Sequence, residues 1–494
     1  MKGKNETELS KYKKEGKKLT PPLAQIGMTK ASWIDDRLPE ILWAVLIISQ
    51  LEREDALAFF RYCLEFTLNK KDLFDITISG ISKFSELDRI AFITHICSYA
   101  KEDICTLLRP ILLFPNLPFI KEWEDVINKK PVPIKDWSTL GNAVQDCLWH
   151  QSQKATDCRW LKLTAAINSG KMHVPPDMLS EILNYPNKGD QRKVRPMIRA
   201  AEIMQIPGIS MNTWAMDFWN YSYNFTGCIS EDSIEGEKNV KYKGLENEIT
   251  KSHDHYYKET QKVWNELIDH SIETSTTSAV DPKHEAVFGL TMYALTIFIE
   301  NNMYKTGLSI NGRVMLRILF ETYATLAYLI KKEFENPEIW SEYRSYGSGQ
   351  ANLIYRKFEE GNLKSFSINK EKIEQIANED VWVEFIPINL GHWDSLDLRK
   401  ICEYIGEKNM YDKYYAYTSS FVHANWLAIR ESVYQKCYNP LHRFHRLPLY
   451  QFPLMNSVTE DMLDIVNKTL FIMSLVYPKI SIQVKEFIPA NTEI

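Results

Sequence analysis

The sequence lacks the short motifs that mark the common nucleotide-binding and hydrolytic enzymes. It contains no Walker phosphate loop, no G-x-G-x-x-G after a predicted strand, no G-x-S-x-G and no H-E-x-x-H. The usual parts for nucleotide hydrolysis and for the common hydrolase reactions are therefore missing, and we expect no cofactor. The eight cysteines are scattered without a C-x-x-C pair, which favours buried thiols in a reducing compartment.

The sequence also lacks a long apolar run and a strong charge of either sign. Its longest charge-free apolar run, Ala286–Ile299, is shorter than the roughly 18–20 residues of a membrane span and indicates a buried core helix. The lysine-rich start carries no secretory signal. The formal net charge of -5 gives no global attraction to nucleic acid or to an anionic membrane. We therefore predict a cytoplasmic protein with no membrane contact.

Apolar residues recur at helical spacing along most of the chain, whereas strand signals are nearly absent. This pattern predicts an all-α fold, with an N-terminal helical array or bundle followed by a second helical bundle. We expect a flexible basic arm at 1–22, a helical domain at 30–225, a linker at 226–244 and the C-terminal bundle at 245–480. The arm holds seven lysines with almost no large aliphatic residues, and the linker gains glycine and charge.

The second half is predicted to consist of long helices joined by short connections, with an irregular excursion at Pro387–Asp397. The expected helices are Leu245–Thr274, Glu285–Met303, Asn311–Phe334, Pro337–Glu360, Lys370–Glu384, Leu396–Met410, Lys413–Cys437 and Ser457–Pro478.

Two of these helices carry polar residues sorted onto one face. In the helix at Asn311, Arg313, Arg317 and Glu321 follow one another at i, i+4 spacing among apolar residues. In the helix at Lys413 the polar face comprises Tyr415, Ser419, His423, Trp426 and Arg430. Because an unpaired buried ion is costly, we predict that the two polar faces meet.

Two interpretations of that meeting remain open. In one, the polar groups form a buried network that fixes the register of the two helices. In the other they form a catalytic site, where His423 is a general acid or base, Arg317 holds a phosphate or transition-state charge, and Glu321 orients them.

The pair Arg317 and Glu321, followed later by Y-x-x-x-S-x-x-x-H at Tyr415, Ser419 and His423, resembles an uncharacterised bacterial family classed only as a domain of unknown function, numbered 5677. The resemblance covers about residues 285–432. The bundle of that family is similar to the HEPN superfamily, whose active members are metal-independent ribonucleases and toxins, many of them in phage defence and often dimeric. The resemblance implies a HEPN-like bundle acting on RNA, with these five residues as catalytic candidates.

Active HEPN ribonucleases carry an R-x4–6-H motif, and here only Arg89 and His95 have that spacing. This pair lies in the N-terminal half, outside the resemblance, and we interpret it as chance. Catalysis in the second half would therefore use a rearranged set, with Arg317, Glu321 and His423 at its centre.

Two basic clusters are candidates for contact with phosphates, and a solvated loop is the alternative for each. The residues are Arg192, Lys193 and Arg195 in the first cluster and Arg443 and Arg446 in the second. His253 and His255 resemble half a metal site, but i and i+2 positions on a helix point apart, so no metal site is predicted.

Two functional hypotheses follow. The first is a toxin-type or phage-defence effector in which the C-terminal bundle cleaves RNA, two copies pair, and the N-terminal helices bind a partner protein. The second is a non-catalytic helical scaffold for a protein or nucleic-acid partner.

Overall fold

A computed structural model describes residues 12–20, 32–69, 75–185, 191–204, 213–230, 238–361, 367–378, 396–449, 454–478 and 482–488, with no side chains for 69, 177, 191–193, 204 and 238–249. The described chain is helical apart from two short strand pairs, which confirms the predicted all-α fold. It divides into two compact units. Unit 1 comprises Met1–Ile234 and Lys436–Arg446, and unit 2 comprises Glu235–Gln435 and Leu447–Ile494.

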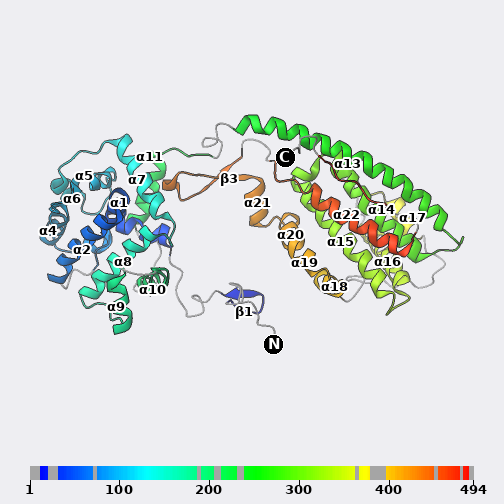
Figure 1. The fold of residues 1–494 in the computed structure, drawn as a ribbon, viewed down its shortest axis with the longest axis horizontal. Coiled ribbons are helices and arrows are strands. Elements are labelled where there is room, and N and C mark those ends of the chain that lie inside the picture. The colour runs from blue at the N-terminus through cyan, green and yellow to red at the C-terminus, as the bar shows by residue number, and fades with distance from the viewer. Residues whose placement is uncertain are drawn as a thin grey trace. The chain divides into compact units, whose positions relative to one another are not determined.

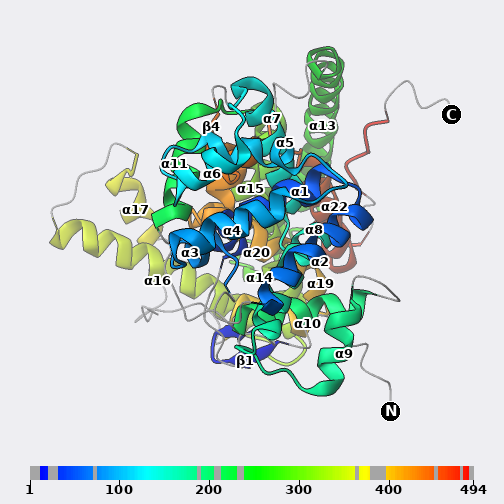
Figure 2. The same cartoon turned by 90° about the vertical axis from the view of Figure 1, so that its left-hand side faces the viewer.

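Unit 1 is an array of short helices (Figures 1 and 2). Its helices are η3 (Trp33–Arg37), η4 (Pro39–Ile41), α1 (Leu42–Gln50), α2 (Arg53–Asn69), α3 (Ile78–Ile81), α4 (Glu86–Cys97), α5 (Ile104–Leu108), η5 (Arg109–Leu113), α6 (Ile120–Ile127), α7 (Pro133–Leu148), α8 (Gln153–Asn168), α9 (Pro176–Asn184), α10 (Gln191–Met204), α11 (Thr213–Phe225) and η8 (Pro440–His442).

Helix α1 is the centre of the unit 1 core. Every residue from Leu42 to Ile48 is fully buried, as expected for a helix that is apolar on all sides. It packs against α2, α5, α7 and α8. The aromatic helix α11 adds Trp214, Phe218 and Trp219 to the same core, so most of its rings serve packing.

A buried ion cluster joins η3, α8 and α10 within unit 1. The side chain of Glu202 is 1% exposed and pairs with Arg37, while Lys162 Nζ lies 3.2 Å and Arg159 Nε 4.0 Å from its carboxylate. The Arg159 guanidinium also lies over the Trp33 ring, 4.5 Å from the ring centroid. Burial, together with the charge of Arg37, lowers the pKa of Arg159. The carboxylate of Glu202 therefore lies within 4.0 Å of three cationic side chains.

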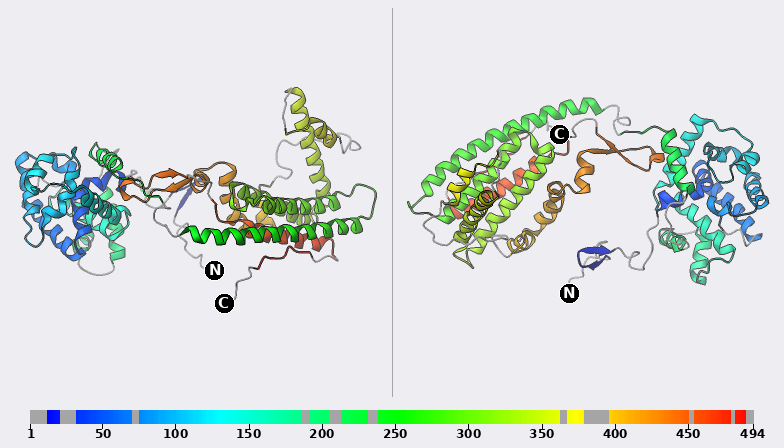
Figure 3. Two further views of the ribbon diagram at one scale, coloured as in Figure 1. Left: turned by 90° about the horizontal axis from the view of Figure 1, so that it is seen from above. Right: turned by 180° about the vertical axis from the view of Figure 1, so that it is seen from behind.

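Unit 2 is a bundle of longer helices. They are α13 (Lys238–Thr274), α14 (Pro282–Met303), η6 (Thr306–Leu308), α15 (Ile310–Lys332), α16 (Ile339–Glu360), α17 (Lys370–Ala377), α18 (Leu398–Ile405), α19 (Lys408–Met410), η7 (Tyr411–Tyr415), α20 (Ala416–Val422), α21 (Trp426–Ser432) and α22 (Thr459–Val476). Helices α13, α14, α15 and α22 run alongside one another in the views of Figures 1 and 3.

Helix α15 is the central element of unit 2, because it packs against α14, α18, α20 and α22. The chain makes a tight turn into α15, where a Cβ at Gly312 would lie 2.4 Å from the Thr306 carbonyl oxygen. Only glycine therefore fits at 312 without a shift of the backbone. This close approach places the start of α15 against η6.

Four strands complete the described elements: β1 (Lys13–Glu15), β2 (Lys18–Thr20), β3 (Tyr434–Lys436) and β4 (Arg446–Pro448). Strands β1 and β2 form an antiparallel hairpin in which Lys13 pairs with Thr20, within the segment expected to be a basic arm. Strands β3 and β4 form the second pair.

Two boundaries differ from the pattern in the sequence. Helix α13 already begins at Lys238, so residues 238–244 of the expected linker are helical. Residues 436–446, which the sequence pattern assigned to the C-terminal bundle, belong to unit 1. Most of the excursion expected at Pro387–Asp397 lies outside the described residues. Within the described chain, no helix is long and apolar enough to cross a membrane.

Candidate functional site

Arg313 lies at the start of the predicted polar face on α15, and its guanidinium donates hydrogen bonds within unit 2. It is 1% exposed. Its Nη1 donates to the carbonyl oxygens of Gly307 at 2.9 Å and Ser309 at 3.2 Å, and its Nη2 donates to that of Asn456 at 2.6 Å. These bonds fasten η6 and the segment before α22 to α15. Arg313 is thus a structural residue.

One turn later, Arg317 forms a clamp between α15 and η7. Its Nε donates to Glu321 Oε1 at 2.6 Å, and its guanidinium carbon lies 4.2 Å from the centroid of the Tyr415 ring. That ring stacks on Tyr411, with 4.5 Å between the centroids. Burial by itself would lower the pKa of Arg317, but Glu321 and Tyr415 together raise it. The guanidinium therefore stays charged.

The predicted meeting of the two polar faces is thus present at one point, the contact of Arg317 with Tyr415. The rest of the second face is arranged differently. Among the described residues, neither Arg317 nor Glu321 hydrogen-bonds to Ser419 or His423. The five catalytic candidates therefore do not form one hydrogen-bonded set.

The second polar face is also interrupted, because the segment from Lys413 to Cys437 is not one helix. A π-helical turn, η7, leads into α20, which ends at Val422; α21 begins at Trp426. Between them Ala424 has a φ of +48°, a left-handed conformation that ends the helical periodicity. The prediction of a continuous face through His423, Trp426 and Arg430 is therefore wrong beyond Val422.

The break creates an exposed turn, which we call the elbow and define as His423, Asn425, Trp426 and Arg430. All four side chains are exposed, Trp426 by 59%. Trp426 and Arg430 are i and i+4 on α21, so they share one face of that helix. The elbow is held by Tyr417 Oη on α20, which donates to Glu431 Oε1 on α21 at 2.6 Å. It presents an imidazole, an indole and a guanidinium to solvent.

The basic candidates lie in unit 1. Arg195 is half-buried on α10, whereas the side chains of Arg192 and Lys193 lie outside the described residues. Arg443 forms an ion pair with Asp35, Nη1 to Oδ1 at 2.7 Å, so part of its charge is already neutralised. Arg446 is half-buried at the start of β4.

The R-x5-H pair in the N-terminal half is occupied by structural contacts. Arg89 Nη2 pairs with Glu122 Oε1 at 2.6 Å. The His95 ring stacks on Tyr62, with 4.2 Å between the ring centroids. Both side chains thus stabilise the packing of α4.

A different cluster, whose members come from two distant parts of the sequence, could hold a metal. The ligand atoms of Cys228, Cys437, His442 and His445 all lie within 4.8 Å of one another in unit 1. Three of the four lie in C-x4-H-x2-H, a local signal that could have been noticed. The fourth, Cys228, comes from a distant part of the chain, so only the fold shows the whole set.

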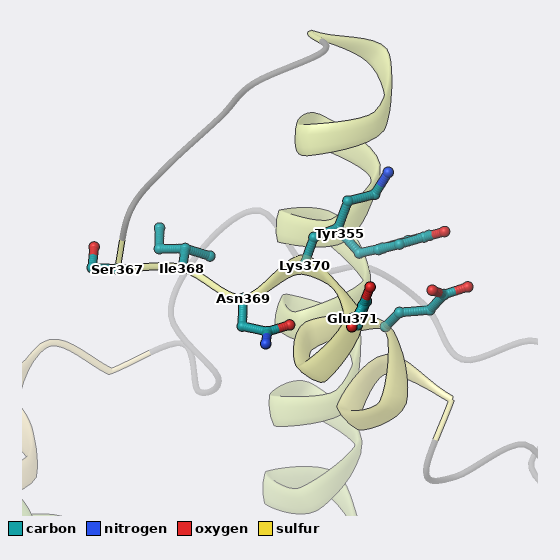
Figure 4. Close-up of a pocket in the computed structure, with 7 residues that line it drawn as sticks. Tyr355, Ser367, Ile368, Asn369, Lys370 and Glu371 are labelled. Atoms are coloured by element: carbon teal, nitrogen blue, oxygen red, sulfur yellow. The ribbon is translucent and has the colours of Figure 1, made fainter.

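A pocket lies between α16 and α17 (Figure 4). Its lining contains no residue of the elbow and none of the four possible metal ligands. Its lining includes Tyr355, Asn369 and Lys370. Lys370 pairs with Glu359 and lies over the Tyr355 ring, 5.9 Å from the centroid. The lining therefore offers no imidazole or thiol for catalysis.

The geometry defines a two-unit helical protein whose second unit carries a clamped α15 and an exposed elbow. Residues 284–436 match the model of a family described as a family of unknown function, DUF5677, which confirms the family resemblance seen in the sequence. The match spans α14 to β3 and so includes both the clamp and the elbow. No curated protein and no solved structure matches the chain.

Proposed function

We propose that the chain is a cytoplasmic effector of the toxin or phage-defence type, in which unit 2 is a HEPN-like bundle that acts on RNA. The observation that carries this proposal is the elbow, where His423, Trp426 and Arg430 are exposed together. An exposed indole can stack on an unpaired base, and an arginine can contact the phosphates beside it. A histidine can exchange a proton near neutral pH.

In the proposed reaction, His423 removes the proton of a ribose 2′-hydroxyl. The 2′-oxygen attacks the adjacent phosphorus, the bond to the 5′-oxygen of the next nucleotide breaks, and a proton returns to that oxygen. The products are a 2′,3′-cyclic phosphate and a 5′-hydroxyl, and no metal takes part. Arg430 stabilises the charge on the phosphorane. Arg317, Glu321 and Tyr415 are positioning residues that hold the start of α20.

The test uses the purified full-length chain and labelled single-stranded RNA. We expect His423→Ala to abolish cleavage while binding persists, and Trp426→Ala to weaken binding, since stacking contributes about 1–3 kcal/mol per base. His173→Ala is the matched control, because His173 is also exposed but lies in unit 1. Cleavage that survives in folded His423→Ala would refute the mechanism.

A second candidate, the non-catalytic scaffold, is favoured by a separate observation. Arg313, Arg317 and Glu321 are all engaged in internal contacts, and the elbow is flanked by exposed Val422 and Leu427. Apolar groups gathered on a surface are typical of protein docking sites. Under this hypothesis, Leu427→Ala would reduce partner binding and the wild type would leave RNA intact.

Three further parts of the proposal concern location and partners. The cytoplasmic location is supported by eight free cysteines. Pairing of two copies follows from the HEPN-like resemblance, and sedimentation of the full chain would test it. Partner recognition by the N-terminal helices would be tested by binding assays with exposed unit 1 positions changed.

A further inference from the structure

We infer that Cys228, Cys437, His442 and His445 bind one zinc ion, at a site in unit 1 that is separate from the proposed function of unit 2. The Cys228 Sγ atom lies 3.5 Å from His442 Nδ1 and 3.4 Å from His445 Nε2. The Cys437 Sγ atom lies 3.5 Å from His442 Nδ1. In a tetrahedral zinc site, with Zn–S about 2.3 Å and Zn–N about 2.0–2.1 Å, the sulfur and nitrogen ligands are about 3.6 Å apart. The three distances match that edge.

The backbone brings the four ligands together from two segments. Cys228 follows the end of α11, while Cys437 follows β3 and His445 precedes β4. The Cys437 amide donates to the His445 carbonyl at 2.9 Å, and the Tyr438 amide donates to the Ile229 carbonyl at 2.8 Å. The first bond closes the loop that carries three ligands. The second attaches this loop beside Cys228.

The conformation of the loop aims the two imidazoles at one point. η8 holds His442, and the two residues after it, Arg443 and Phe444, have φ of +51° and +54°. The left-handed conformation costs conformational free energy in residues other than glycine, and here two such residues follow one another. Their effect here is to reverse the chain so that His445 faces Cys228. Strain of this kind is expected where a bound group holds the geometry.

The contacts behind the ring of His442 indicate which of its nitrogens carries the proton. His442 Nε2 lies 3.2 Å from the Thr226 carbonyl oxygen and 2.9 Å from Thr226 Oγ1. The Thr226 hydroxyl donates its own hydrogen to the Ser222 carbonyl at 2.7 Å, so it also accepts from His442. Because a carbonyl can only accept, Nε2 carries the proton, and Nδ1 keeps a lone pair directed at the two thiols. Asn439 Nδ2 donates to the Gly227 carbonyl at 2.7 Å. Metal-bound histidines usually donate the hydrogen of their other ring nitrogen to a carbonyl or carboxylate, as His442 Nε2 does here.

A metal ion satisfies more of the contacts in the cluster than hydrogen bonds do. Each thiol has one proton, and His442 Nδ1 has one lone pair, yet this nitrogen lies within 3.5 Å of both sulfurs. At least one sulfur–nitrogen contact would then lack a hydrogen. A cation with two thiolates and two neutral imidazoles satisfies all four groups. Two sulfur and two nitrogen ligands in a tetrahedron favour zinc over magnesium or calcium, which prefer oxygen.

The proposed site is structural, because four protein ligands leave no open position for a substrate. Its effect is to fasten residues 436–446 to the chain after α11 within unit 1. Zinc bound only by the folded protein adds its binding free energy to folding. Metal removal should therefore loosen this loop, while the α1 core of unit 1 is retained.

The experiment measures metal in the full-length chain, expressed with added zinc and purified under reducing conditions. We expect one zinc ion per chain in the wild type, and loss of zinc in Cys228→Ser and in His445→Ala. Cys228 is exposed, so its serine variant disturbs packing least. Cys105→Ser is the matched control, because Cys105 is a half-buried cysteine of unit 1 outside the cluster; it should keep its zinc.

A second measurement on the wild type keeps the test independent of how the variants fold. The chelated protein, titrated with cobalt(II), should show strong visible bands of tetrahedral cobalt and a thiolate charge-transfer band. Hydrogen exchange at Cys437 and Tyr438 should become faster on chelation and slow again with zinc. A folded wild type with no zinc and no cobalt–thiolate band would overturn the inference. A Cys228–Cys437 disulfide that persists through purification under reducing conditions would also overturn it.

Discussion

Replacing Glu321 with alanine tests whether the clamp on α15 is a partly buried ion pair. Arg399 and Glu403 on α18 provide a matched control. Both pairs are Arg and Glu at i, i+4 in the same order, and Nε lies 2.6 Å from Oε1 in the first and 3.0 Å in the second. They differ in burial, because the Arg317 side chain is 14% exposed and that of Arg399 is 57% exposed.

The expected magnitudes follow from this difference. Glu403→Ala removes an exposed i, i+4 pair, which contributes about 0.3–0.5 kcal/mol to the free energy of unfolding. Glu321→Ala removes a charge-assisted hydrogen bond of about 1.5–3 kcal/mol. Because Glu321 is 41% exposed, water screens part of that, and we expect a loss of about 1–2 kcal/mol. Both variants replace Glu by Ala within a helix, so most of the gain in helix propensity cancels in the comparison.

The assay must report on unit 2 alone, since two compact units can unfold separately. Native-state hydrogen exchange of the α15 amides, followed in low urea, gives the free energy of opening that helix. Equal losses in the two variants would show that the clamp is only a surface pair. A loss above about 3 kcal/mol for Glu321→Ala would show that the pair is fully buried, contrary to the 41% exposure of Glu321 in the structure.

Two other predictions concern buried charge. Glu202→Gln should destabilise unit 1 by about 3–5 kcal/mol, because it leaves Arg37, Arg159 and Lys162 without their shared carboxylate. Urea unfolding, followed by a probe in α10, measures the change in the free energy of unfolding. A loss below about 1 kcal/mol would contradict the prediction. Burial lowers the pKa of His253 below its ordinary value of 6.5. Between the lowered pKa and 6.5 the unfolded state binds more protons than the folded state, so unit 2 should lose stability as the pH falls through this window. His253→Gln should flatten that dependence, and an unchanged pH profile would rule His253 out as its source.

The helices with continuous apolar faces were predictable from the sequence. The expected helix Asn311–Phe334 corresponds to α15, and Pro337–Glu360 corresponds to α16. The predicted helix Lys413–Cys437 was wrong, because the helix breaks at a residue type that does not usually end helices. Ala424 adopts positive φ although alanine gives no such signal. The break at Gly406, φ +88°, carries a glycine and could have been predicted.

The candidate site was partly predictable for the same reason. The spacing of Arg317 and Glu321 on one helix is a local property, and their pairing follows from it. The contact of Arg317 with Tyr415 depends on tertiary packing. The prediction that the two polar faces meet anticipated this contact. The Cys228 cluster depends on residues 436–446 belonging to unit 1. Sequence spacing does not encode that long-range return of the chain.

RNA cleavage by unit 2 is tested most directly by expressing wild type and His423→Ala in bacteria, with and without phage infection. Growth and the integrity of total RNA are measured, and hydrogen exchange of α15 shows that the variant is folded. We expect growth arrest and RNA fragmentation in the wild type, and the loss of both in the variant. Intact RNA and equal growth in the two strains would contradict the RNA-cleaving function and favour the scaffold.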